Sequence, residues 1–361
     1  MWPSPRRRRF PRPALERAFG VGLALLALSA CELPSERVDP TDLRGGFERR
    51  DAGPSATAAS SAPPAQSASS AASAGTPPIV PRDPNPSGCV EPRDTARALR
   101  RTAGRPACRA AEILELRDSQ GSPRYACFYA PSGASTRGPM PLVVFFHGTG
   151  PTTDDPSSLA KLTKLRDLQQ SYVWPGTEIR GFGVLAVQGR ALEGGDALGF
   201  DVAHTSEHAP DVVITNEFVE RIRARGLVDE RRIYALGMGK GGQMAAAWSM
   251  IRADRVAAFA SFGATEPEVS WRCPGPPPPA MLLYRACDSV APCEEVERWI
   301  AKRRDARADT MTLRLGDDLR EEPACAVRNK CTPKKALAAH HRWPKGRESD
   351  VLAFFAQHAL R

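Results

Sequence analysis

Residues 231–251, RRIYALGMGKGGQMAAAWSMI, constrain the fold more than any other part of this chain. The apolar, partly β-branched run 233–236 ends in glycines and predicts a strand, and the helical spacing of apolar residues after Gly242 predicts a helix. Strand, sharp turn and helix in this order lift the residue at the tip of the turn above the C-terminal edge of a sheet. Its side chain there faces a ligand, and nearby backbone N–H groups point at it. The tip residue of this chain is Gly239.

Strand and helix patterns alternate from residue 124 onward. Such alternation predicts an α/β fold, a mostly parallel sheet covered by helices on both faces, with ligands at the carboxyl ends of the strands. Residues 89–118 give no prediction. Strands are predicted at 124–130, 141–146, 182–187, 256–262 and 280–284, and helices around 159–168, along the face of Ile214, Phe218 and Ile222, and at 294–302 and 351–360.

The N-terminus, residues 1–30, is typical of an export signal. Six arginines precede an apolar stretch, 19–30, that is too short to span a bilayer comfortably, and Leu28-Ser29-Ala30-Cys31 follows. This pattern resembles a bacterial lipoprotein signal and predicts that Cys31 is lipidated. The alternative is an ordinary secretory signal in which Cys31 is incidental.

Residues 31–87 are dominated by Ala, Ser, Pro and Gly. A segment of this composition cannot bury enough apolar area to offset its chain entropy, so we expect a disordered tether. The globular domain is expected at 88–361. Together these features predict an exported protein that Cys31 anchors to a lipid bilayer of the bacterial envelope.

The charge of the chain gives no indication of a nucleic-acid partner. The formal net charge is +9, and the six Arg and one Glu of the leader account for five of these charges, which leaves +4 on the mature chain. A mildly basic surface without clustered lysines and arginines is the ordinary solvated case.

Eight cysteines remain when Cys31 is set aside: Cys89, Cys108, Cys127, Cys273, Cys287, Cys293, Cys325 and Cys331. An even number in an oxidising compartment predicts up to four disulfides, whose pairing the sequence leaves open. The spacings Cys287/Cys293 and Cys325/Cys331 indicate either two small loops or a cross-link between the two regions. No metal is expected, because the C-x-x-C pairs typical of a zinc site are absent.

Three loops carry candidate chemistry. His147-Gly148-Thr149-Gly150 follows the strand PLVVFF, and a tight turn there lets the Thr149 N–H point at an oxyanion. Asp288 follows a strand and can orient an imidazole, and His341 precedes the last helix where a general base would approach the tip. The alternatives are a plain turn at His147, a turn or cap role for Asp288, and surface or packing roles for histidines, the role expected for His340.

In these segments the chain resembles the secreted polyhydroxybutyrate depolymerase and feruloyl esterase-like α/β-hydrolases, over roughly residues 124–361. The matching motifs are PLVVFFHGTG, GLVDERRIYALGMGKGGQMAA, the D-x-V-x-P that begins at Asp288 and the H-x-W-P that begins at His341. The resemblance implies an α/β-hydrolase fold with Asp288 as triad acid, His341 as base, and an oxyanion hole formed by the N–H groups of Thr149 and Lys240. No cofactor is implied.

The chain departs from the family at the nucleophile, because Gly239 stands where the G-x-S-x-G elbow has serine. We therefore expect a catalytically impaired, esterase-like protein that retains binding of an ester, a polymer or a glycan. One alternative is an active ester hydrolase in which His341 and Asp288 activate a water.

A further alternative is a dinucleotide-binding loop, since Gly237-x-Gly239-x-x-Gly242 also fits the G-x-G-x-x-G fingerprint. The fingerprint strand is normally the first of its domain and is followed about 20 residues later by an acidic residue. The predicted strand before Gly237 comes about fifth, and the only acidic candidate is Glu266, so this alternative fits less well.

Overall fold

A computed structural model describes residue 89 and residues 103–119, 121–150, 163–191, 197–203, 205–271, 273–326, 331–332, 337, 340 and 343–361. All of them belong to the unit Pro77–Arg361. The predicted signal, the predicted tether and Cys31 lie outside the described residues. Among the helices of the described part, none has the length and apolar character needed to cross a membrane.

The centre of the fold is an eight-stranded sheet in the order β1-β2-β4-β3-β7-β8-β9-β10. β2 pairs antiparallel with β1 and β4, and every other pair in this sheet is parallel. A short hairpin, β5–β6, lies apart from it. The strands are β1 Glu112–Arg117, β2 Pro123–Tyr129, β3 Met140–Phe146, β4 Gly183–Val187, β5 Arg190–Ala191, β6 Leu198–Gly199, β7 Val228–Met238, β8 Ala258–Phe262, β9 Ala280–Arg285 and β10 Thr310–Leu315.

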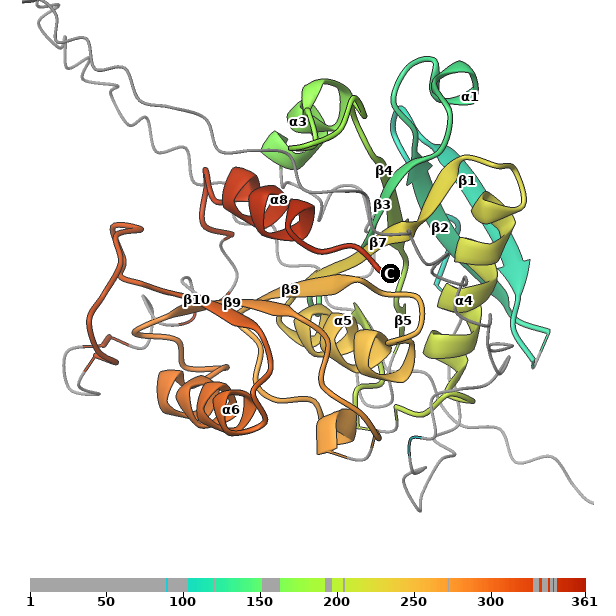
Figure 1. Cartoon of the computed structure of the whole chain (residues 1–361). Helices are drawn as coiled ribbons and strands as arrows, with labels where there is room; N and C mark the ends of the chain where they lie inside the picture. Colours follow the sequence, from blue (N-terminus) through green and yellow to red (C-terminus); the bar gives the residue numbers. More distant parts are fainter. Residues whose placement is uncertain are drawn as a thin grey trace, which may run out of the picture. The chain divides into compact units, whose positions relative to one another are not determined.

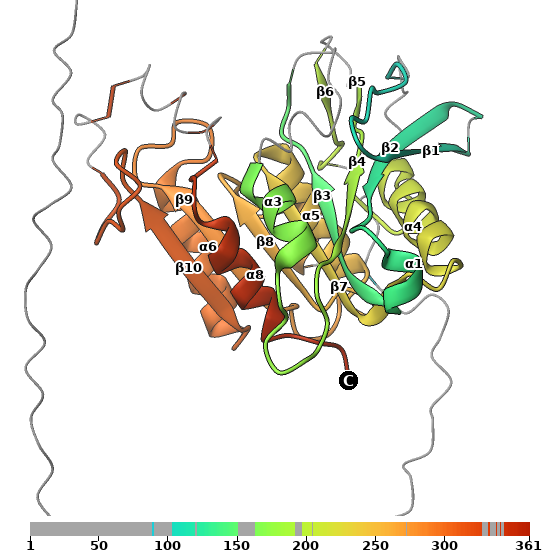
Figure 2. The same cartoon turned by 90° about the horizontal axis from the view of Figure 1, so that it is seen from above.

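Helices cover both faces of the sheet, with α3 and α8 on one side and α4, α5 and α6 on the other (Figure 1, Figure 2). Alternate residues of each strand enter two separate cores, as strand geometry requires. In β3, Leu142 and Val144 face one core and Val143 and Phe145 the other. The helices are α1 Ala134–Arg137, α3 Thr163–Ser171, α4 Pro210–Arg223, α5 Lys240–Ile251, the 3₁₀ turn Glu268–Trp271, α6 Cys293–Asp305 and α8 Glu348–Ala356.

The expected architecture is confirmed: a mostly parallel sheet with helices on both faces. Each strand predicted from residue 124 onward is present within a few residues of its expected bounds, and α4, α5, α6 and α8 lie where helices were predicted. α3 begins at Thr163, and the preceding part of the predicted helix lies outside the described residues. β1 and β10, the two edge strands of the sheet, were not predicted.

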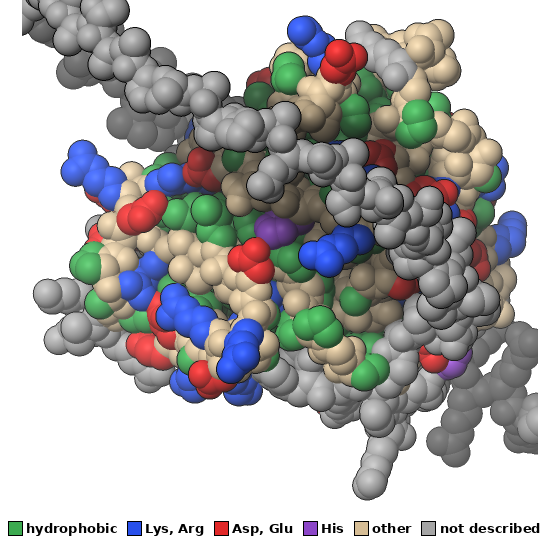
Figure 3. All heavy atoms as spheres, viewed as in Figure 1, with side chains coloured by type: hydrophobic (Ala, Val, Ile, Leu, Met, Phe, Trp, Pro, Cys, Tyr) green, Lys and Arg blue, Asp and Glu red, His purple; other side chains and the backbone are tan. Residues whose placement is uncertain are grey.

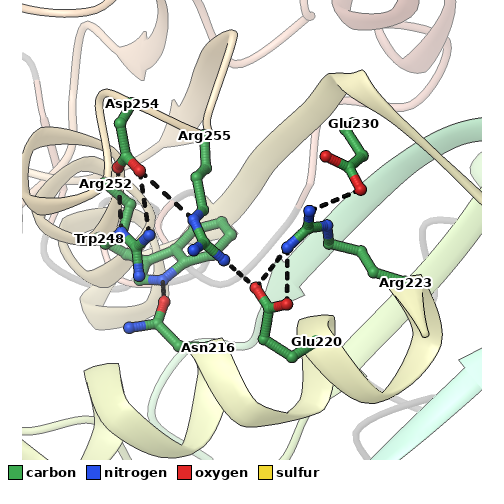
Figure 4. A network of polar contacts seen from close by, with 8 residues as sticks. All are labelled: Asn216, Glu220, Arg223, Glu230, Trp248, Arg252, Asp254 and Arg255. Carbon is green, nitrogen blue, oxygen red and sulfur yellow. Dashed lines mark hydrogen bonds and ion pairs between the residues drawn. The ribbon is translucent and has the colours of Figure 1, made fainter. Parts of the chain in front are cut away.

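A polar network fastens α4 to the C-terminal end of α5 (Figure 4). The Trp248 indole N–H donates to Asn216 Oδ1 over 2.9 Å, and the Glu220 carboxylate binds the guanidinium groups of Arg223 and Arg255. α5 also packs on β7 and β8, and ten of its twelve residues are buried. Its N-terminus, which follows the Gly239 turn, is thereby held at a fixed height above the sheet.

Asp211, in the first turn of α4, joins four segments. It accepts hydrogen bonds from Arg124 in β2 (2.7 Å), Arg190 in β5 (3.2 Å) and the Asp201 N–H (3.0 Å), and it is 1% exposed. Burial raises the pKa of Asp211, but the two arginines and the Asp201 N–H outweigh burial, so that the pKa lies below its usual value. The carboxylate is therefore ionised in the folded protein.

All eight cysteines of the domain are paired: Cys89–Cys273, Cys108–Cys127, Cys287–Cys331 and Cys293–Cys325. The prediction of four disulfides is confirmed. The sequence left open whether the last four cysteines form two small loops or a cross-link between the region of Cys287 and Cys293 and the region of Cys325 and Cys331. The structure has the cross-link, made by two disulfides rather than one.

Replacing Asp211 with Asn should lower the free energy of unfolding by about 3–5 kcal/mol, because two buried arginines lose their counter-charge. Denaturant titration with the disulfides intact measures this change. The lowered pKa stabilises the fold above the unfolded-state pKa, and this stabilisation is lost as the pH falls through the folded-state pKa. The difference between the wild type and Asp211→Asn should therefore narrow below about pH 4.

Glu112→Gln is the matched control, since Glu112 binds Arg225 at 2.7 Å in a more exposed pair. Exposed ion pairs contribute about 0–1 kcal/mol. Equal losses in the two variants would contradict the special role of Asp211.

Candidate functional site

The turn between β7 and α5 has the geometry that the sequence predicted for residues 231–251. Gly239 lies at its tip with φ 53° and ψ −127°, a conformation that L-residues adopt only under strain. Its N–H donates to the Phe262 carbonyl over 2.8 Å, and its carbonyl accepts from the N–H groups of Gly242 and Gln243. The turn is thus fixed from both sides.

The other glycines of this motif are explained by close packing. A Cβ on Gly237 would lie 2.1 Å from the Gly241 carbonyl oxygen, and one on Gly241 would lie 2.2 Å from that of Phe146. The glycines let α5 approach the strands, a requirement that exists without any phosphate. The acidic candidate of the dinucleotide alternative, Glu266, pairs with Lys302 at 2.8 Å. These contacts give that alternative no support.

Asp288 follows β9 and is 7% exposed. Its Oδ1 accepts from the N–H groups of Val290 and Ala291 at 2.8 and 2.9 Å, which forms the local turn that was one alternative for this residue. Its Oδ2 lies 2.9 Å from an imidazole Nδ1, which is the other alternative. Both roles are therefore filled by one carboxylate.

The imidazole that binds Asp288 belongs to His340 and not to His341. His340 is 8% exposed, and its Nε2 lies 3.1 Å from the point where a Cβ of residue 239 would be. The expectation of a surface or packing role for His340 is corrected by this contact. His341, the expected base, lies outside the described residues.

The backbone at His340 is helical, and successive side chains of a helix point about 100° apart, so two neighbouring histidines face different directions. The sequence carries no signal that selects between them. With Nδ1–H donating to Asp288, His340 presents Nε2 to the tip of the turn, as the base of a catalytic triad does. Gly263, which sequence reasoning missed, leaves room for the pair: its Cβ would lie 3.3 Å from both Asp288 Oδ2 and His340 Nδ1.

The His147-Gly148 turn lies against the same tip, with Gly148 Cα 3.9 Å from the Cβ position of residue 239. The buried His147 accepts the Gly189 N–H at Nε2 over 2.8 Å, so its Nδ1 carries the proton and donates to the Gly148 carbonyl at 2.7 Å. In the trans peptide that follows, the Thr149 N–H points away from that carbonyl. His147 therefore orients the Thr149 N–H.

These segments surround one cavity of about 290 Å³. Gly239, Thr149, Lys240 and His340 all line it, so the structure brings together every described residue of the expected site. Asp288 lies behind His340. In the face drawn in Figure 3, a histidine side chain lies in a hollow beside hydrophobic side chains.

Lys240 is the first residue of α5, and its N–H has no acceptor within the helix. The positive end of the helix dipole and the Lys240 ammonium both favour negative charge at the tip. Asp288, the carboxylate that binds His340, is engaged by three donors. The arrangement can polarise a carbonyl and accept a proton at Nε2.

One group among the described residues has metal-ligand spacing: Cys293, Glu297 and Cys325. The two sulfurs are joined in a disulfide, and Glu297 binds Tyr284 and Arg314. A cysteine binds a metal as its thiolate, so these residues do not fit a metal ion while the disulfide is intact.

No protein-family model and no curated protein sequence matches the chain. Similar solved structures are esterases. They include a thermostable esterase (14% identity, 69% of this chain and 63% of that chain, TM-score 0.48), a Bacillus cereus carboxylesterase (16%, 65% and 94%, 0.44) and propionate-bound Est2 from the Planctomycetes species Thermogutta terrifontis (16%, 58% and 85%, 0.45).

At these identities the likeness concerns the fold alone, and the chain's own elements define that fold. A mostly parallel sheet carries a strained strand–turn–helix at a central strand, an HG turn beside it, and an Asp and a His on later loops. These are the parts of an α/β-hydrolase in their usual chain order. The protein has the α/β-hydrolase fold.

The turn should respond very differently to alanine at two of its glycines. Gly237→Ala sets a Cβ against backbone and should lower the free energy of unfolding by about 3 kcal/mol or more. Gly239→Ala meets only backbone strain and the His340 ring, which should cost about 1–3 kcal/mol. Denaturant titration ranks the two, and an equal or reversed ranking would contradict the turn geometry.

Proposed function

We propose that this protein is an esterase-like α/β-hydrolase-fold protein whose elbow serine is replaced by Gly239. In this proposal it binds an ester, a polymer end or a glycan ester in the cavity and is catalytically impaired. The observation that carries the proposal is the Asp288–His340 pair, whose Nε2 faces a glycine in elbow conformation.

Without a side-chain hydroxyl there is no atom to form an acyl-enzyme. Removal of a triad nucleophile leaves roughly 10³–10⁴-fold acceleration over water, from the oxyanion hole and binding. In this chain those remaining elements correspond to the N–H groups of Thr149 and Lys240. The proposal therefore assigns to the site the recognition of a carbonyl without rapid turnover.

The cavity supports a small acyl ligand. Its volume of about 290 Å³ is at the lower end of the roughly 300–1,000 Å³ typical of ligand sites. A polymer or glycan would place one ester unit in it and leave the remainder outside. Val290, which is 55% exposed, and Met238 offer apolar contacts at this site.

A second candidate function is slow ester hydrolysis by a water that His340 activates. The distance of 3.1 Å between His340 Nε2 and the Cβ position of residue 239 favours this function, since Nε2 faces the space that a serine side chain would fill. Direct attack by water gives up the two-step covalent route, so this activity would be weak.

Gly239→Ser should create ester hydrolysis with a burst of product from a p-nitrophenyl ester, whereas the wild type should show no burst. The serine Cβ requires His340 to move by a few tenths of an ångström, since the distance is 3.1 Å. Gly239→Ala is the matched control, because it adds the same strain without a hydroxyl. A silent but folded Gly239→Ser variant that also binds no ester would contradict the proposal.

Two histidine variants test the assignment of the base in the same assay. His340→Ala should remove the activity of Gly239→Ser, and His341→Ala should leave most of it. Steady turnover by the wild type that disappears in His340→Ala would establish the second candidate instead.

The proposal also places the protein in the cell envelope, anchored through Cys31. The leader pattern and the four disulfides, which persist in oxidising compartments, support this placement. The segment 31–87 would then hold the domain away from the bilayer.

Expression of the full chain in a bacterium with radiolabelled palmitate should label the protein and place it in the membrane fraction. Cys31→Ser should abolish the label, because the thiol is the site of acylation. Export of an unlabelled, soluble wild type would show that the leader is an ordinary secretory signal.

A further inference from the structure

Two disulfides bracket the Asp288–His340 pair. Cys287 immediately precedes Asp288 and binds Cys331, nine residues before His340. Cys293, the first residue of α6, binds Cys325. Both bonds therefore join the loop that carries the carboxylate to the segment that leads to the imidazole.

The segment needs such ties because it is long. β10 ends at Leu315 and α8 begins at Glu348, and His340 lies late in the interval. Besides the disulfides, one described hydrogen bond joins this interval to the acid loop, from the Ala326 N–H to the Ala286 carbonyl at 3.1 Å. Beyond His340, Trp343 packs on Phe262 with ring centroids 5.5 Å apart.

We propose that Cys287–Cys331 and Cys293–Cys325 position His340 against Asp288, so that the oxidised chain holds the imidazole in this orientation more firmly than the reduced chain does. The cysteines act through the histidine and are positioning residues. The inference goes beyond the proposed function, because it concerns the pair whatever ligand the cavity takes.

The ties are accessible to a reductant. Cys287, Cys325 and Cys331 are partly exposed, whereas Cys108 and Cys127 are buried. A small dithiol attacks one sulfur of the exposed bond as its thiolate, and its second thiol then displaces the mixed disulfide. Two electrons pass to the protein, which gains two thiols, and the reductant becomes a cyclic disulfide.

The expected effect follows from the number of residues between His340 and the last tie that precedes it. With both bonds intact this tie is Cys331, nine residues away, and without Cys287–Cys331 it is Cys325, fifteen residues away. Without either bond, and with the neighbouring Ala326 hydrogen bond lost, it is the hydrogen bond from the Glu322 N–H to the Arg314 carbonyl of β10, eighteen residues away. Since closure probability falls roughly as the −3/2 power of length, the pair should form about twofold less readily without the first bond and about threefold less readily without both.

The test follows the imidazole directly, by NMR of the mature chain labelled with ¹⁵N-histidine. His340→Ala identifies the Nδ1–H resonance of the Asp288 hydrogen bond. Cys287→Ser/Cys331→Ser should weaken this resonance and speed exchange of its proton with solvent about twofold, and the variant lacking both bonds should do so about threefold. Cys108→Ser/Cys127→Ser, which lacks a disulfide outside these loops, should leave the resonance unchanged.

Stepwise reduction of the folded wild type by a dithiol gives the same comparison where a variant fails to fold. The resonance should weaken as the Cys287–Cys331 bond opens and before Cys108–Cys127 opens. An unchanged resonance after both ties are lost, or an equal loss in the Cys108/Cys127 control, would overturn the inference. Absence of ester binding would reject the proposed function and leave this readout intact.

Discussion

The hydrogen bond between Asp288 and His340 is the contact on which the site depends, and it joins residues 52 positions apart. The carboxylate lies in the loop after β9, and the imidazole lies on helical backbone in the interval between β10 and α8. The carboxylate is fixed by its own turn through Val290 and Ala291, and Gly263 leaves space for the imidazole ring and the carboxylate. The imidazole is thereby locked in one tautomer with Nε2 toward the cavity.

The floor of the cavity is fixed by a different physical requirement. α5 lies so close to β3 and β7 that Gly237 and Gly241 have no space for a side chain. This packing dictates the course of the chain at the tip, whatever residue occupies position 239. The His147-Gly148 turn lies beside this floor, where a neutral His147 holds the Gly148 carbonyl by a hydrogen bond of 2.7 Å. Backbone contacts thus define these parts of the cavity.

The sequence predicted the parts of this structure that follow from local pattern. Buried parallel strands are continuous apolar runs, so β3, β7 and β9 were recognisable, and the glycines marked the turn. The edge strand β1 is half exposed, with a mixed pattern, and β10 carries a buried residue only at its end. Edge strands bury too little surface to stand out from loops.

Two further features could not be predicted, because they depend on distances between segments. Which of two adjacent histidines faces Asp288 depends on the path of the chain between β10 and α8, and the H-x-W-P resemblance favoured His341 where the structure has His340 against Asp288. The nested pairing of Cys287 with Cys331 and Cys293 with Cys325, which the spacing left open, likewise reflects how the two regions lie side by side. Neither is encoded in spacing.

The conformation of Gly239 shows that the geometry of the turn does not depend on a side chain at its tip. An elbow residue with a side chain bears strain of about 1–3 kcal/mol, which the surrounding packing must impose. Glycine adopts φ 53° without that cost, yet the packing of the neighbouring glycines still imposes the turn. The turn therefore keeps this conformation whether or not residue 239 carries a hydroxyl. His340 remains directed at the tip, 3.1 Å from the missing Cβ, because Asp288 and the loops that carry the pair hold it there.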